Sequence, residues 1–175
     1  TPSGTDLTMS IKERPPMRDT GLIHKRGDWG NLPAGEAALA PVEGSTSGTL
    51  VIDNMVDTAL GLSVRHPLKI AVKDGRARSL VGPDAAKLKS ILDAADKNAY
   101  NIAELGIGTN PKARIIGNVL EDEKVLGTVH IAVGDNTSFP GGHTKSNIHL
   151  DGILLQPTVK IDKRLLIQNG KLLVE

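Results

Sequence analysis

Glycine and proline interrupt this chain so often that it must turn many times along its length. Its 175 residues include 19 glycines and 10 prolines, and both residue types favour turns, because glycine adopts left-handed backbone conformations and proline fixes its φ angle. They follow no fixed period, which excludes collagen-like chains and repeat arrays. The length is that of a single domain.

Short segments between the turns predict β-strands. Residues 5–11 alternate polar and apolar side chains, as a half-buried strand does. Residues 48–53 and 68–73 also have strand character, and the pair Asp74-Gly75 predicts a hairpin turn after the second of them. The other strand candidates are residues 76–81, 130–133, 148–155, 158–161, 165–167 and 172–174.

Two segments have helical character. Apolar residues between Ala85 and Ala99 recur at every third or fourth position, and Pro83-Asp84 supplies a helix start. A shorter helix is expected at 119–126, where acidic residues fall in the first turns. The prediction is an α+β fold with about two helices. It is mainly antiparallel β-sheet, barrel-like or sandwich-like, with residues 1–175 as one domain.

Composition limits what such a domain can bind. One Trp, one Tyr and one Phe leave an aliphatic core and no base-stacking platform. The net charge of +1 gives no electrostatic reason to bind nucleic acid or an anionic membrane. Because cysteine is absent, disulfides, thiolate zinc sites and thiol nucleophiles are excluded. No apolar run approaches the ~20 residues of a membrane-spanning helix, and a cytoplasmic location is expected.

Histidine and acidic residues in apolar surroundings indicate a metal site. His149 and Asp151 lie two residues apart on an expected strand, so they point to the same face and can share an ion. Glu36, Glu104 and His130 each have apolar neighbours, where a carboxylate is costly unless it is paired, hydrogen-bonded or bound to metal. Each residue alone is better explained as a surface ion pair or a hydrogen-bonded core group. As a set without cysteine, they suit Zn, Mn, Co or non-haem Fe.

Five segments, in order along the chain, resemble the thermophilic aminopeptidase family of metallopeptidases, which includes aminopeptidases T and S. They are NLPAGE (31–36), APVEGSTSGTLVID (40–53), IAELGIGTNP (102–111), EDEKVLGTVHIAVGDN (121–136) and HLDG (149–152). The resemblance extends from about residue 5 to residue 173 and covers the metal-bearing C-terminal part of that family. It implies that this chain, which begins at Thr1, is the C-terminal fragment of a longer two-domain protein, and that the protein is a homodimer.

The same resemblance implies a two-metal site. Its implied ligands are Glu36, Glu104, Glu123, His130, His149 and Asp151. Glu104 and Glu36 are also the implied catalytic residues, with Glu104 bridging the ions, whereas Glu123 fits the family pattern only with two residues inserted. The predicted function is removal of N-terminal residues from a peptide or amino-acyl substrate, by water activated between two Zn, Co or Mn ions.

A relative of that family implies a second chemistry. It is a mononuclear iron enzyme, a ring-cleaving 2,5-dihydroxypyridine dioxygenase. The two histidines and one carboxylate that bind Fe(II) in iron oxygenases can be drawn here as His130, His149 and Asp151. Retention of the two glutamates favours the aminopeptidase. A threonine, Thr137, at the position of a tyrosine of the family's peptidases favours the dioxygenase as the alternative.

Overall fold

Antiparallel sheets form most of the computed structural model, which describes residues 1–173. The largest sheet has five strands, in the spatial order β11 (His149–Leu154), β10 (Val129–Gly134), β9 (Ile102–Gly108), β3 (Glu36–Leu39) and β2 (Met17–Asp19). A second sheet has the order β1 (Asp6–Thr8), β4 (Ser47–Ile52), β7 (Leu68–Lys73) and β8 (Arg76–Val81). Two small sheets consist of β5 (Met55–Asp57) with β6 (Leu62–Val64), and of β12 (Val159–Ile161), β13 (Arg164–Gln168) and β14 (Lys171–Leu172). The predicted α+β, mainly antiparallel fold is confirmed, with open sheets.

The two larger sheets share one aliphatic core. Along β7, Leu68, Ile70 and Val72 are buried while the residues between them are exposed, as the alternation of a strand dictates. These side chains belong to the same buried cluster as residues of β10 and β11. Trp29, by contrast, is 75% exposed. Phe139 belongs to a separate small cluster, so the buried residues of the main core are aliphatic, as predicted.

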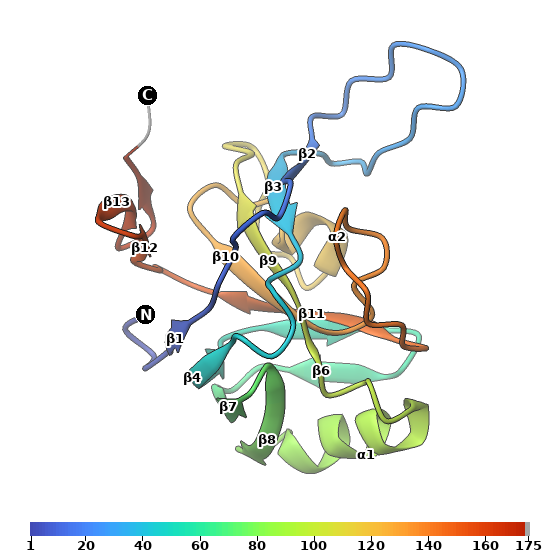
Figure 1. Ribbon diagram of the computed structural model, residues 1–175, viewed down its shortest axis with the longest axis vertical. Helices are drawn as coiled ribbons and strands as arrows, with labels where there is room; N and C mark the ends of the chain where they lie inside the picture. The colour runs from blue at the N-terminus through green and yellow to red at the C-terminus, as the bar shows by residue number, and fades with distance from the viewer. Residues whose placement is uncertain (174–175) are drawn as a thin grey trace.

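Helix α1 (Ala85–Ala95) lies against β8 (Figure 1) and directs Leu88 and Leu92, one turn apart, into this core. It ends before the predicted limit because Asp96 is extended and accepts hydrogen bonds from the backbone N–H groups of Asn98 and Asn147. Helix α2 (Val119–Asp122) is also shorter than predicted. No helix of residues 1–173 is both long and apolar enough to span a bilayer.

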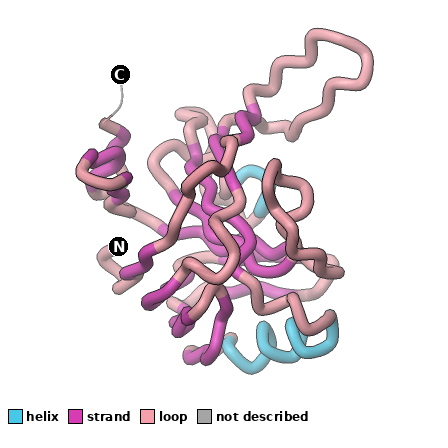
Figure 2. The backbone as a smooth tube through the Cα atoms, in the orientation of Figure 1, coloured by secondary structure: helices cyan, strands magenta, loops and turns pink. Residues whose placement is uncertain are grey.

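Five strands are not among the predicted ones: β2, β3, β5, β6 and β9. The first four have only three or four residues each, too few to display a clear period, whereas the seven residues of β9 include two glycines. The connection between β2 and β3, residues 20–35, extends away from the sheets as a long loop (Figures 1 and 2). The predicted strand at 172–174 is confirmed only through Leu172, and its last residue lies outside the described part.

Gly152 sets how closely the two larger sheets approach. A Cβ added there would lie 2.7 Å from the Cδ1 and Cγ1 atoms of Ile52 on β4. We therefore expect Gly152→Ala to overpack the core and lower the free energy of unfolding by about 1–3 kcal/mol. Urea unfolding measures this change. Unaltered stability would mean that Ile52 moves aside without resistance.

Candidate metal centre

The register of four neighbouring strands gathers five of the six predicted site residues, all except Glu123, on one face of the five-stranded sheet. On β10, which lies between β9 and β11, Ala132 pairs with Glu104 of β9 on one side and with Asp151 of β11 on the other. Its methyl group leaves the space between the two carboxylates open. His130 lies two residues earlier on β10, and therefore on the same face.

A glycine on β9, Gly106, leaves room for the His130 ring. Gly106 of β9 pairs with His130, and a Cβ at Gly106 would lie 1.9 Å from the His130 Nε2 atom. The fully buried imidazole thus lies over the β9 backbone, where it meets Glu104 and Glu36. Glu36 is the first residue of β3, on the other side of β9.

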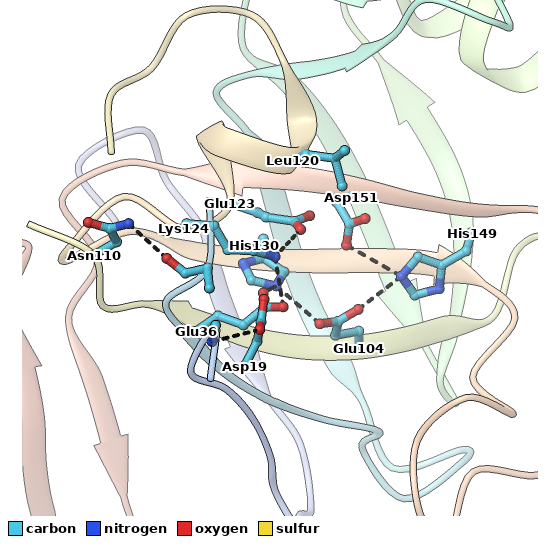
Figure 3. A network of polar contacts seen from close by, with 12 residues as sticks. Asp19, Glu36, Glu104, Asn110, Leu120, Glu123, Lys124, His130, His149 and Asp151 are labelled. Carbon is cyan, nitrogen blue, oxygen red and sulfur yellow. Dashed lines mark hydrogen bonds and ion pairs between the residues drawn. The ribbon is translucent and has the colours of Figure 1, made fainter. Parts of the chain in front are cut away.

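Glu104 lies between the two histidines (Figure 3). Its Oε1 atom is 3.1 Å from His130 Nε2, and its Oε2 atom is 2.9 Å from His149 Nε2. Glu36 Oε2 lies 3.2 Å from the same His130 nitrogen. Asp151 Oδ1 lies 3.5 Å from His149 Nε2. A buried carboxylate therefore links both histidines in one network.

The second nitrogen of His149 fixes the orientation of its ring. Nδ1 lies 2.7 Å from the backbone oxygen of Asp135, and a carbonyl can only accept, so Nδ1 donates. In the neutral imidazole the free lone pair is then on Nε2, which faces Glu104 and Asp151. This arrangement is the usual one for a histidine that binds a metal ion.

Lys124 is a member of the cluster that the sequence analysis missed. Its side chain is fully buried, and its ammonium group pairs with Glu123 and lies 2.8 Å from Glu36 Oε1. Glu123 itself follows α2 and contacts Lys124 (Figure 3). A lysine directly beside a candidate ligand was the available clue, but lysine is so commonly exposed that its sequence position alone does not indicate burial.

The cluster fits a metal ion. Three sets of residues each place ligand atoms within 4.8 Å of one another: Glu36, Glu104 and His130; Glu104, His149 and Asp151; and Glu123, His130 and Asp151. Two buried acceptors, Glu36 Oε2 and Asp151 Oδ1, form no well-aligned hydrogen bond among the described residues, although a histidine Nε2 atom lies 3.2 Å from the first and 3.5 Å from the second. All six predicted ligands therefore meet at this centre. None of these sets in residues 1–173 contains both histidines, so the His130, His149 and Asp151 set is not brought together as a single group.

Burial and the neighbouring charges shift the pKa values of several side chains in the cluster. Burial alone would lower the pKa of His149, but the hydrogen bonds that its ring donates to Asp151 and Glu104, together with their negative charges, outweigh burial and raise the pKa to about 11. Burial and the charge of Asp151 raise the pKa of Glu123 to about 7. Burial would raise the pKa of Glu104, but hydrogen bonds from His130 and His149 keep it below its ordinary value. Without a metal ion, protons supply part of the positive charge that the carboxylates need.

We expect metal binding at pH 7 to release protons. A metal ligand must be deprotonated, whereas the pKa of about 11 keeps His149 protonated in the metal-free protein. The affinity for Mn²⁺ should therefore rise with pH, by roughly tenfold per pH unit for each proton released. Titration calorimetry in buffers of different ionisation enthalpy measures the proton count. A binding heat that is independent of the buffer would contradict this expectation.

Gly106→Ala should impair the centre in addition to lowering the stability of the fold. The new methyl group would displace the His130 ring from Glu104, and loss of such a supporting contact weakens metal binding by roughly 10–100-fold. Mn²⁺ titration of the purified variant measures the loss. Gly152→Ala, on the opposite face of the same sheet, serves as the control that loses stability but keeps its metal affinity.

The chain is similar to one protein family and to two solved structures. The family model NicX, 2,5-dihydroxypyridine 5,6-dioxygenase, matches residues 1–174. The solved 2,5-dihydroxypyridine dioxygenase of Pseudomonas putida KT2440 has a TM-score of 0.86 and 22% identity, over 99% of this chain and 53% of that one. Wild-type AmpT of Thermus thermophilus has a TM-score of 0.76 and 20% identity, over 98% of this chain and 48% of that one. No curated protein matches by sequence search. The chain thus spans about half the length of these two structures, whose likeness shows a shared fold.

These comparisons correct the predicted function. The aminopeptidase prediction is wrong, because the family model that spans the chain is that of a dioxygenase. The predicted hydrolysis of peptides is wrong for the same reason. The broader prediction of an enzyme agrees with the family match, and the expected likeness to the aminopeptidase T scaffold is confirmed at the level of the fold.

Proposed function

We propose that this chain, which belongs to the 2,5-dihydroxypyridine 5,6-dioxygenase family, is the metal-binding part of an enzyme that opens a dihydroxylated pyridine ring with Fe(II) and dioxygen. The family match over residues 1–174 is the observation that carries the proposal. In such a reaction both atoms of dioxygen enter the product, so no external reductant is needed. The expected substrate is a small aromatic molecule and not a peptide.

Glu104, His149 and Asp151 are the residues that we assign to the iron. They form one of the three sets with metal-ligand spacing. They include the most accessible side chains of the centre, because His149 is 30% and Asp151 13% exposed, whereas Glu104 is 5% exposed. A ferrous ion held by three protein ligands would supply the redox chemistry and keep coordination positions free for oxygen and substrate.

The surrounding residues hold these ligands in place. His130 contacts Glu104 from the buried side, and the Asp135 carbonyl holds the His149 ring from the other. The Phe139 ring lies near the His149 ring, with their centroids 6.2 Å apart. His130 thus acts as a positioning residue in this assignment, and the substrate would approach from the side of His149.

The proposal is tested by iron content and oxygen uptake. After anaerobic loading with Fe(II), the protein should consume oxygen in step with the loss of 2,5-dihydroxypyridine. Asp151→Asn should lower iron affinity and oxygen uptake together, by roughly 10–100-fold or more, because it removes a charged ligand. Asp162→Asn, at an exposed turn between β12 and β13, should change neither.

Two results would reject the proposed chemistry. One is iron bound at this centre without any oxygen uptake in the presence of the substrate. The other is release of amino acids from peptides in the absence of oxygen. Either result would separate the function of this chain from that of the family it matches.

A further inference from the structure

We propose that the buried ammonium group of Lys124 takes the place of a second metal ion beside Glu36 and Glu123. The protein would therefore bind one divalent ion and not two. This inference rests on the proposed function, because it assigns that ion to Glu104, His149 and Asp151. It gives Glu36 and Glu123 a different role from the one predicted from the sequence. They would hold the ammonium group and not a metal ion.

Lys124 contacts a carboxylate in two of the three candidate ligand sets and none in the third. Its ammonium group contacts Glu36, which belongs to the set with Glu104 and His130. It also contacts Glu123, which belongs to the set with His130 and Asp151. Two of the three sets thus already have a cation on one of their carboxylates. The set of Glu104, His149 and Asp151 is the one that contains neither partner of Lys124.

The ammonium group is held where a second ion would have to compete with it. The Lys124 side chain has no exposed surface, so its charge cannot move into water while an ion binds. An ammonium donates and never accepts hydrogen bonds, and like charges at this range repel strongly in a buried site. A second divalent ion on Glu36 would therefore have to displace Lys124 or bind beside it at a high cost.

The backbone around Lys124 also prevents it from moving away. Its N–H donates to the Glu121 carbonyl at 3.0 Å, and its carbonyl accepts from the Asn110 N–H at 2.9 Å. Strand β9 passes so closely that a Cβ at Gly108 would lie 2.8 Å from the Lys124 carbonyl carbon. The lysine is thus fixed to the strand that presents Glu104.

The exposure of the three sets agrees with this division. Glu36, Glu104 and His130 are all buried, and so is Glu123. His149 is the most exposed of the predicted ligands. The charge of Lys124 lies on the closed side, and the set left for the ion lies on the side that small molecules can reach.

The decisive experiment compares Mn²⁺ binding to the wild-type chain and to Lys124→Met. The wild type should bind about one Mn²⁺ per chain, with the electron paramagnetic resonance spectrum of an isolated ion. Lys124→Met keeps the length of the side chain and removes its charge, so it should bind about two ions with a spin-coupled spectrum, since paired ions in such sites lie ~4 Å apart. Lys112→Met, an exposed lysine close in sequence, controls for the loss of a positive charge.

Two further variants keep the test valid if Lys124→Met is unstable. Glu36→Gln should retain about one ion per chain, because Glu36 is not its ligand in this proposal. The double variant Glu36→Gln with Lys124→Met removes one charge of each sign, and it should fold and bind about one ion. Added Mn²⁺ should raise the melting temperature of Lys124→Met more than that of this double variant.

Three outcomes would overturn the inference. They are two ions in the wild type, one ion in a folded Lys124→Met, or loss of the ion in Glu36→Gln. None of these measurements depends on oxygen uptake. A chain with one Mn²⁺ and no ring-cleaving activity would therefore reject the proposed function and leave the role of Lys124 standing.

Discussion

Repulsion among carboxylates is the constraint around which this molecule is arranged. The register of β3, β9, β10 and β11 brings Glu36, Glu104 and Asp151 to one face, and Glu123 joins them from the end of α2. Carboxylates this close cannot all remain ionised in a buried site without positive charge beside them. Two imidazoles, one lysine and a metal ion are the available sources. The chemistry of the centre follows from how that charge is divided.

The sequence predicts the local features of this centre well. The period of a strand places His149 and Asp151 on one face, and the structure has them on β11. Apolar neighbours of Glu104 and His130 indicate burial, which both residues show. The helix α1 and the hairpin at Asp74-Gly75 are likewise predictable, because their signals lie within a few residues of each other.

What the sequence does not predict depends on contacts between distant segments. The pairing of β3 with β9 brings Glu36 next to His130, which lies 94 positions further along the chain. Lys124 reaches Glu36 across a similar separation, and nothing in its immediate neighbours indicates an ammonium group with no exposed surface. The choice between two chemistries also escapes local reasoning, because a dioxygenase and AmpT share this scaffold. The upstream domain and the homodimer stay predictions.

Gly106 carries a consequence for how such chains can diverge. The His130 ring packs directly on the backbone at position 106, so any side chain there would occupy the space of the imidazole. A lineage that replaced His130 by a small residue would lose the constraint that keeps position 106 bare. Conversely, a side chain acquired first at 106 would expel the imidazole before any substitution at 130 had occurred. The two positions are thus expected to covary among related sequences, with glycine at 106 wherever histidine stands at 130.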